Sequence, residues 1–163
     1  MFQFFVIVII SVLAVLDQLV KHIVTDYVFI NSSKKFLFGL FQLTYVENTG
    51  AAFSSFSNST LVLSVLTSII IAVCLVYLFM RKSPSIFVTV SLILIVSGGI
   101  GNMIDRISNG YVIDFIEPLF IKFAVFNIAD CFITVGAFML AGYELISGLK
   151  KPKNDSGRGD KSA

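Results

Sequence analysis

Four long apolar stretches divide the chain, and polar residues collect between them. The stretches cover approximately residues 2–24, 60–80, 85–104 and 129–149. Each is close to the roughly 20 helical residues that cross the apolar core of a bilayer. The pattern predicts four membrane-spanning helices in one membrane-embedded domain (1–150), with two segments, 25–59 and 106–128, on one side of the membrane. The polar tail (151–163) is expected to be disordered.

The first of these segments has the pattern of a strand. Its sequence FLFGLFQLTYVENTGAAF contains β-forming residues that alternate before a turn-like ENTG. The alternating residues are Leu43, Tyr45 and Glu47 on one face, with Thr44 and Val46 on the other. Its many aromatic side chains suit the boundary between lipid and water. We therefore expect a small sheet that lies on the membrane surface.

Composition agrees with a membrane protein. The chain is 56% hydrophobic and 13% charged, with a mean hydropathy of +0.92. The first stretch lacks the basic start and cleavage site of a signal peptide, and Asp17 and Lys21 interrupt its far end, so we expect a mature helix. The net charge of +2 is small and scattered, which excludes a nucleic-acid partner.

The distribution of basic residues predicts the orientation in the membrane. The loop between the second and third spans and the tail together hold seven lysines and arginines. The opposite side holds three, or five if two residues at the span ends are counted. These are Lys34, Lys35 and Lys122, with Lys21 and Arg106 at the span ends. By the positive-inside rule, both termini are expected in the cytoplasm and the two polar segments on the outer side.

Metal, cofactor and disulfide chemistry find little support. The chain has one histidine, His22, and neither an HExxH motif nor paired Cys/His spacing. Cys74 and Cys131 each lie inside an expected span, where a thiol behaves as a small hydrophobe. We expect no metal, no cofactor and no disulfide.

Polar residues inside the spans are the strongest functional signal. A charge at the bilayer centre costs about 2.5–3.5 kcal/mol on insertion scales, so such residues usually face a bundle interior or a water-filled cavity. In the third span, Gly98, Gly101, Asn102 and Asp105 recur on one helical face. The fourth span has a similar stripe that begins at Asp130. Both stripes are expected to point into the space that the helices enclose.

The remaining polar residues are expected at the same depth, near the outer end of the bundle. Asp17 and Lys21, four residues apart on one helix, are placed to pair. Arg106 follows Asp105 directly and should therefore point elsewhere. The expected cluster is Asp17, Lys21, Asn48, Asn102, Asp105, Arg106, Asp114, Asn127 and Asp130.

Each residue also has a purely structural interpretation. The pairs of Asp17 with Lys21 and of Asp105 with Arg106 can satisfy each other inside the membrane. Asn48 and Gly50 can form a simple turn, and Asp130 can cap the start of the last span.

Together, however, Asp114 and Asp130 suggest catalysis. Two carboxylates held close in a low-dielectric site cannot both ionise, so they share a proton. The ionised member can take a proton from an attacking water, and the protonated member can donate to a carbonyl oxygen. Asp114 and Asp130 are sixteen positions apart across the second outer segment and could meet in this way.

Five motifs carry a resemblance to a known family. In chain order they are DQLVK (17–21), ENTGAAF (47–53), GGIGNMIDR (98–106), VIDF (112–115) and FNIAD (126–130). Their order and spacing resemble the lipoprotein signal peptidases, also called signal peptidase II, a family of bacterial membrane aspartic endopeptidases. The resemblance extends over residues 2–149.

The resemblance implies an all-α membrane protein, with four transmembrane helices and a small extracytoplasmic β-cradle, in the bacterial cytoplasmic membrane. It implies catalysis by Asp114 and Asp130, with no cofactor, near the outer face. The implied substrate-binding or supporting residues are Asn48, Gly50, Ala51, Gly101, Asn102, Asp105, Arg106, Asn127, Asp17 and Lys21. The implied substrates are diacylglyceryl-modified prolipoproteins, cut before the lipidated cysteine of the lipobox. Membrane lipid would contact the chain, and globomycin-like cyclic peptides would occupy the site.

Other functions remain alternatives on the sequence. A proton- or ion-coupled transporter also carries intramembrane carboxylates, but here the polar residues gather toward one side and no broken-helix repeat is visible. A non-catalytic scaffold would tolerate asparagine at positions 114 and 130. A serine intramembrane protease fits poorly because Ser97 has only His22 as a candidate base, and GNMID lacks the GxGD pattern of a presenilin-like dyad.

Overall fold

Four long helices dominate the part of the chain that the structure describes. This computed structural model describes residues 1–31, 33–50, 60–81 and 85–150. The helices are α1 (Phe2–Asn31), α2 (Thr60–Met80), α3 (Ile86–Ser108) and α4 (Ile128–Lys150). All four are long and apolar enough to cross a membrane. Helix α1 runs seven residues beyond the expected span, because no glycine or proline interrupts it before Asn31.

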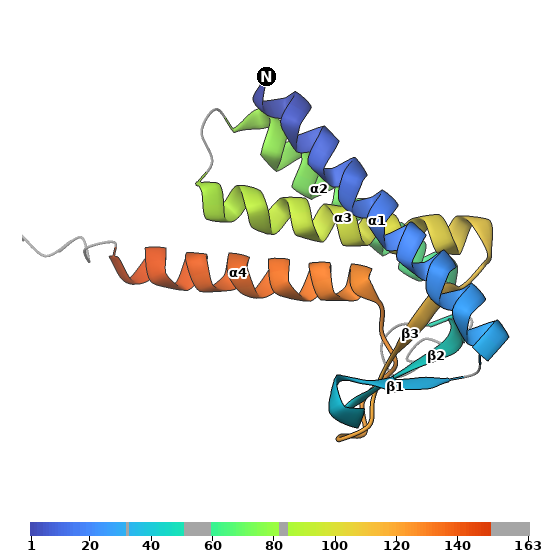
Figure 1. Cartoon of the computed structure of the whole chain (residues 1–163). Helices are drawn as coiled ribbons and strands as arrows, with labels where there is room; N and C mark the ends of the chain where they lie inside the picture. Colours follow the sequence, from blue (N-terminus) through green and yellow to red (C-terminus); the bar gives the residue numbers. More distant parts are fainter. Residues whose placement is uncertain (32, 51–59, 82–84, 151–163) are drawn as a thin grey trace, which may run out of the picture.

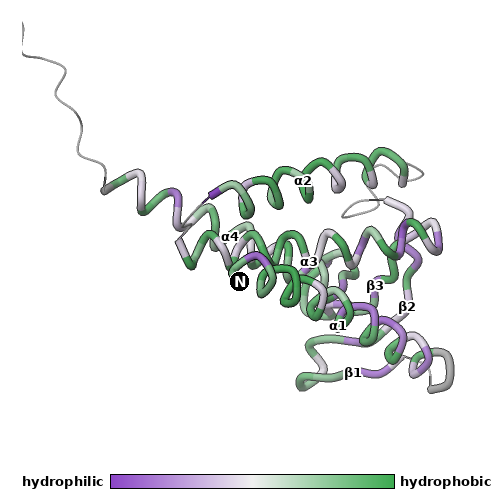
Figure 2. Tube along the Cα trace, turned by 90° about the horizontal axis from the view of Figure 1, so that it is seen from above, coloured by the Kyte–Doolittle hydropathy of each residue, from purple (hydrophilic) through white to green (hydrophobic). Residues whose placement is uncertain are grey.

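Helix α3 lies at the centre of the bundle and contacts α1, α2 and α4 (Figure 1). The core is apolar and includes Val6 and Ile10 of α1, Leu78 of α2, and Leu92 and Val96 of α3. The outward faces of α1, α2 and α4 carry exposed leucine, isoleucine, valine and phenylalanine side chains, so much of the helical surface is hydrophobic (Figure 2). Such a surface suits lipid, and the protein is a multi-pass membrane protein.

Glycines allow α3 and α4 to approach closely near the start of α4. A Cβ atom on Gly98 would collide with the carbonyl oxygen of Ala129, and one on Gly136 would lie 2.6 Å from the carbonyl oxygen of Ser91. Small residues at such positions let helix backbones meet in a membrane. The first turns of α4 are thereby held against α3.

A three-stranded antiparallel sheet lies at one end of the bundle (Figure 1). Its strands are β1 (Lys34–Phe36), β2 (Phe41–Asn48) and β3 (Val112–Pro118), in the order β1-β2-β3. The expected strand around residues 43–47 lies in β2. Strand β3 comes from the second polar segment, where the sequence predicted no strand. The fold class, a helical membrane bundle with a small sheet, is confirmed.

Candidate active site

Strand β3 places Asp114 at the edge of the bundle. Asp114 is opposite Val46 in the β2–β3 register and is only 1% exposed. Two side-chain amides donate to its carboxyl group: Nδ2 of Asn48 to Oδ2 at 2.8 Å, and Nδ2 of Asn127 to Oδ1 at 2.7 Å. Pairing β3 with β2 therefore brings the ENTG and VIDF motifs into direct contact.

Asp130 is held by a reciprocal cap at the start of α4. Oδ1 of Asn127 accepts a hydrogen bond from the backbone N–H of Asp130 at 2.9 Å, and Oδ2 of Asp130 accepts one from the backbone N–H of Asn127 at 3.2 Å. This is the arrangement of a capping box, with Asn127 as the N-cap and Asp130 three residues later. The structural alternative for Asp130, in which it is itself the N-cap, is wrong because the helix begins two residues earlier, at Ile128.

Asn127 thus joins the two carboxyl groups. Its side-chain oxygen caps Asp130, while its side-chain nitrogen donates to Asp114. Asn127 is fully buried, so water does not compete for these bonds. The structure brings together the two aspartates that the sequence paired.

Asn102 of α3 holds Asp130 from the other side. Its Nδ2 donates to Oδ1 of Asp130 at 2.8 Å. Its Oδ1 accepts from Nδ2 of Asn127 at 3.0 Å and from Nζ of Lys21 at 3.1 Å. Because an ammonium group has no acceptor, Lys21 fixes which end of the Asn102 amide faces Asp130.

Lys21 belongs to a buried ion cluster behind the aspartates. Its Nζ lies 2.9 Å from Oδ2 of Asp17 and 2.7 Å from Oδ2 of Asp105, and all three residues are at most 1% exposed. The pairing of Asp17 with Lys21 is confirmed. Oδ1 of Asp17 accepts from the backbone N–H of Ala129 at 2.9 Å, and Oδ2 of Asp105 accepts from that of Ile113 at 3.1 Å. The cluster therefore fixes the start of α4 and the start of β3.

Gly101 leaves room for this cluster. A Cβ atom at that position would lie 2.5 Å from Oδ2 of Asp17. Gln18, which the resemblance implied as a supporting residue of the DQLVK motif, donates from Nε2 to Oδ1 of Asp105 at 2.8 Å and to the carbonyl oxygen of Gly101 at 3.0 Å.

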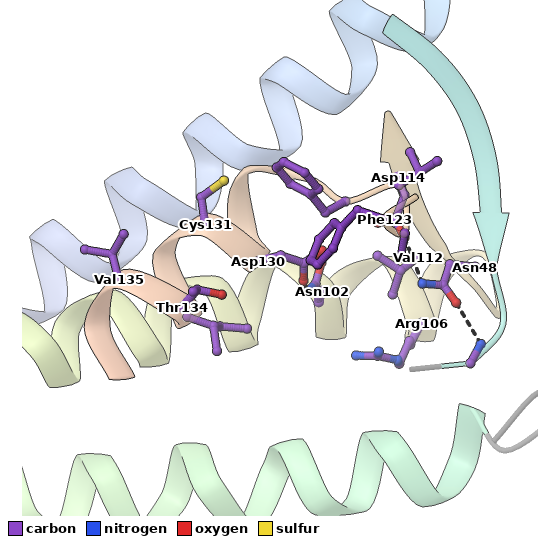
Figure 3. Close-up of a pocket in the computed structure, with 15 residues that line it drawn as sticks. Asn48, Asn102, Arg106, Val112, Asp114, Phe123, Asp130, Cys131, Thr134 and Val135 are labelled. Atoms are coloured by element: carbon purple, nitrogen blue, oxygen red, sulfur yellow. Dashed lines mark hydrogen bonds between the residues drawn. The ribbon is translucent and has the colours of Figure 1, made fainter. Parts of the chain in front are cut away.

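A cavity of about 460 Å³ opens beside the two aspartates (Figure 3). Its polar lining consists of Asn48, Asn102, Arg106, Asp114, Asp130 and Thr134, with Gly50 and Cys131 beside them. The rest is apolar and comes from Val112, from residues 123–126, and from Ile133 and Val135 of α4. The cavity thus joins a polar end, which holds both carboxyl groups, to an apolar wall.

Arg106 points away from its neighbour Asp105, as expected. It lines the cavity, in the cluster where the sequence also placed it. Asp105 points back into the ion cluster, and Arg106, near the end of α3, lies on the cavity side (Figure 3). The two neighbours therefore serve opposite sides of the same helix.

The loop before α4 adds residues that the sequence analysis missed. Phe123, Ala124, Val125 and Phe126 form part of the cavity wall, and Phe126 pairs with Ile116 of β3 through backbone hydrogen bonds. An apolar run between two polar motifs was the only signal. Of the other predicted site residues, Gly50 donates its backbone N–H to Oδ1 of Asn48 at 3.0 Å, and Ala51 lies outside the described residues.

The surroundings of Asp114 favour its protonated form. Burial, followed by the negative charge of Asp130, raises the pKa of Asp114 to about 7, although the Asn48 and Asn127 amides act in the opposite direction. Near neutral pH, Asp114 can therefore keep a proton while it accepts two hydrogen bonds. One member of the pair can act as an acid, as general acid–base chemistry requires.

Comparisons with known proteins find relatives that match most of the chain. The family model described as signal peptidase (SPase) II matches residues 9–146. A lipoprotein signal peptidase of Streptococcus thermophilus is 46% identical over 125 residues, which cover 77% of this chain and 82% of that protein. One of Streptococcus pneumoniae is 38% identical over 147 residues, covering 90% and 94%.

A solved structure is also similar to this one. It is described as a bacterial membrane enzyme, shares 27% sequence identity and a TM-score of 0.74, and the match covers 96% of this chain and 94% of that one.

Proposed function

The chain belongs to the signal peptidase II family, which removes signal peptides from lipoproteins, and we propose that it does so with Asp114 and Asp130 as an aspartic dyad. One observation carries the proposal. Asn127 binds both carboxyl groups, that of Asp114 through its side-chain nitrogen and that of Asp130 through its backbone N–H, at the polar end of a cavity whose remaining wall is apolar.

The dyad would hydrolyse a peptide bond by activating water. Asp130 takes a proton from the water as its oxygen attacks the carbonyl carbon, and Asp114 gives its proton to the carbonyl oxygen. The tetrahedral intermediate then collapses: Asp114 takes back a proton from one of its two hydroxyl groups, the carbon–nitrogen bond breaks, and the new amine leaves with the proton held by Asp130. Asn127 and Asn102 keep the two carboxyl groups in position throughout.

The substrate is a prolipoprotein whose lipobox cysteine carries diacylglycerol, and the cut is made before that cysteine. The apolar wall supports this assignment, because Phe123, Ile133 and Val135 offer acyl chains a surface next to the carboxyl groups. Globomycin-like cyclic peptides would bind in the same cavity. Asn48, Gly50 and Arg106 line it and would contact the peptide, whereas Asp17, Lys21, Gly101 and Asp105 would position the catalytic groups.

The site would lie near the outer face of a bacterial cytoplasmic membrane, with both termini in the cytoplasm. The excess of basic residues in the 81–82 loop and in the tail supports this orientation. The substrate's lipid and its scissile bond would then reach the cavity from the outer leaflet.

The deciding experiment compares cleavage of a diacylglyceryl-modified prolipoprotein by the wild type, Asp114→Asn and Asp130→Asn in nanodiscs. We expect the wild type to cut before the lipidated cysteine and each folded variant to lose at least about 10³-fold in rate, as removal of a catalytic acid or base does. Asp26→Asn, which makes the same change at an exposed aspartate of α1 outside the cavity, is the control with wild-type activity. An inert wild type, or a folded variant with a near-normal rate, would reject the dyad and favour a transporter or a scaffold.

A further inference from the structure

The turn between β1 and β2 exposes large apolar side chains. Phe38 is fully exposed at 104%, and Leu37 and Leu40 beside it are 57% and 47% exposed. Leu37 and Phe38 also have left-handed backbone angles, with φ of 47° and 58°. Residues with a Cβ rarely adopt this conformation, and observed strain of this kind suggests a function.

A second loop completes the same surface. The backbone N–H of Leu119 donates to the carbonyl oxygen of Leu40 at 2.8 Å, and the rings of Phe41 and Phe120 meet edge to face at 5.5 Å. The two loops form one projection, here called the apolar tip. It consists of Leu37, Phe38, Leu40, Leu119, Phe120 and Ile121, which are between 40% and 104% exposed.

The depth of the tip along the bundle indicates that it reaches the membrane. In Figures 1 and 2 the β1–β2 turn reaches back along the bundle, to about the depth of the first turns of α4, whereas α3 ends beyond it. Helix α4 is a candidate membrane span from Ile128 onward. The tip therefore lies at the same depth along the bundle as the beginning of a candidate membrane span.

The charges around the tip fit a phospholipid surface. Lys35 and Lys122 are exposed and flank the tip in the sequence, and neither 34–41 nor 119–123 contains an acidic residue. Lysines beside exposed aromatic and aliphatic side chains are typical of segments that enter a bilayer interface. Anionic phosphate groups complement them.

We propose that the apolar tip inserts into the leaflet on the sheet side of the membrane, with Lys35 and Lys122 at the level of the lipid phosphates. The tip would act as a further lipid contact besides the four spans. It would hold the sheet, and with it Asn48 and Asp114, at a fixed height above the acyl chains. This inference does not depend on the proposed dyad, because it rests on the exposed surface of the sheet alone.

The chain has no tryptophan, so one introduced indole reports on one position. The experiment places Phe38→Trp in nanodiscs with brominated phospholipids and compares it with Asn109→Trp, an exposed residue at the end of α3. We expect brominated acyl chains to quench the fluorescence of the tip indole at least twofold more than that of the control indole. Aqueous acrylamide should quench the control indole more than the tip indole. Phe120→Trp, also at the tip, gives an independent second reading.

Two results would overturn the proposal. Quenching of the tip indoles by acrylamide as strong as that of the control would show that water surrounds the tip. Protection from acrylamide without bromolipid quenching would show that protein covers it instead.

The tryptophan introduced at the tip also tests whether Lys35 and Lys122 contact lipid phosphates. With 30% anionic lipid, Lys35→Glu and Lys122→Glu should lower the bromolipid quenching of the tip indole, whereas zwitterionic lipid should remove this difference. If Lys35→Glu and Lys122→Glu leave the bromolipid quenching unchanged in both anionic and zwitterionic lipid, the two lysines do not contact lipid phosphates.

Discussion

One residue, Asn127, connects the chemistry of the site to its architecture. Its backbone N–H and side-chain oxygen form the capping box with Asp130, and its side-chain nitrogen reaches Asp114. An aspartate at this position would place a third carboxyl group beside the pair, and an alanine would leave buried groups unsatisfied. The amide is suited to the position because it donates and accepts at once.

The raised pKa of Asp114 predicts how stability depends on pH. An unfolded chain releases this proton near pH 4 and the folded protein near pH 7, so between these values the folded state binds more protons and loses stability as the pH rises. A rise in this pKa from 3.8 to about 7 corresponds to a loss of stability on the order of 4 kcal/mol. In Asp114→Asn this contribution is absent. The melting temperature of the variant minus that of the wild type should therefore increase from pH 4.5 to pH 7.5.

Comparison with Glu117→Gln separates this effect from a general loss of charge, since Glu117 is on the same strand but only half-buried. A difference between wild type and Asp114→Asn that is constant across the pH range would contradict the prediction.

At the scale of elements, the contact between α3 and α4 decides where Asp130 lies. Helix α4 begins against α3 because Gly98 and Gly101 leave space for Ala129 and Asp17. The Asn127 cap and the bond from Ala129 to Asp17 then fix the first turn. Helix packing, the helix cap and the ion cluster thus all fix the position of the first turn of α4.

Gly98→Ala should displace the first turn of α4, because the new methyl group meets the carbonyl oxygen of Ala129. Overpacking of this kind costs about 1–3 kcal/mol. We expect a lower melting temperature and at least about 10-fold lower cleavage, since a displacement at the proposed catalytic residues is costly. The measurements are thermal unfolding and cleavage of the lipidated substrate in nanodiscs.

Gly142→Ala is the matched control in α4, because a Cβ atom there meets nothing within 4 Å. It should be neutral or slightly stabilising, given the higher helix propensity of alanine. Equal effects of the two substitutions would show that contact with Ala129 does not matter.

At the scale of the whole molecule, the sheet lies at one end of the bundle (Figure 1), close to polar stretches of α1 and α3 (Figure 2). The two carboxyl groups, the cavity and the apolar tip all belong to that end. The other end carries the N-terminus, the end of α2 and the start of α3. A protein built in this way can act on one face of a membrane.

The proposed orientation predicts which end reacts with a membrane-impermeant maleimide. In a background with Cys74 and Cys131 replaced by alanine, Asn109→Cys should be labelled in intact cells and Ser85→Cys only after the membrane is permeabilised. Asn109 caps the end of α3 at the sheet, and Ser85 precedes its start. The opposite labelling pattern would invert the orientation.

The sequence by itself determined the helices, the polar stripes and the candidate catalytic residues. Apolar length and helical periodicity are local properties, so the spans and the faces carrying Asn102 and Asp105 could be predicted. The five motifs identified Asp114 and Asp130. Strand β3 was missed because VIDFIEP does not alternate cleanly, and a strand depends on the partner with which it pairs.

Only the tertiary structure decided how these residues meet. The sequence could not show that Asn127, rather than Asp130, caps α4, or that Lys21 orients Asn102. These contacts join segments that are distant in the chain, and their geometry depends on the packing of α1, α3, α4 and β3 against one another. Periodicity gives the face of a helix on which a residue lies, whereas packing decides which partner that face meets.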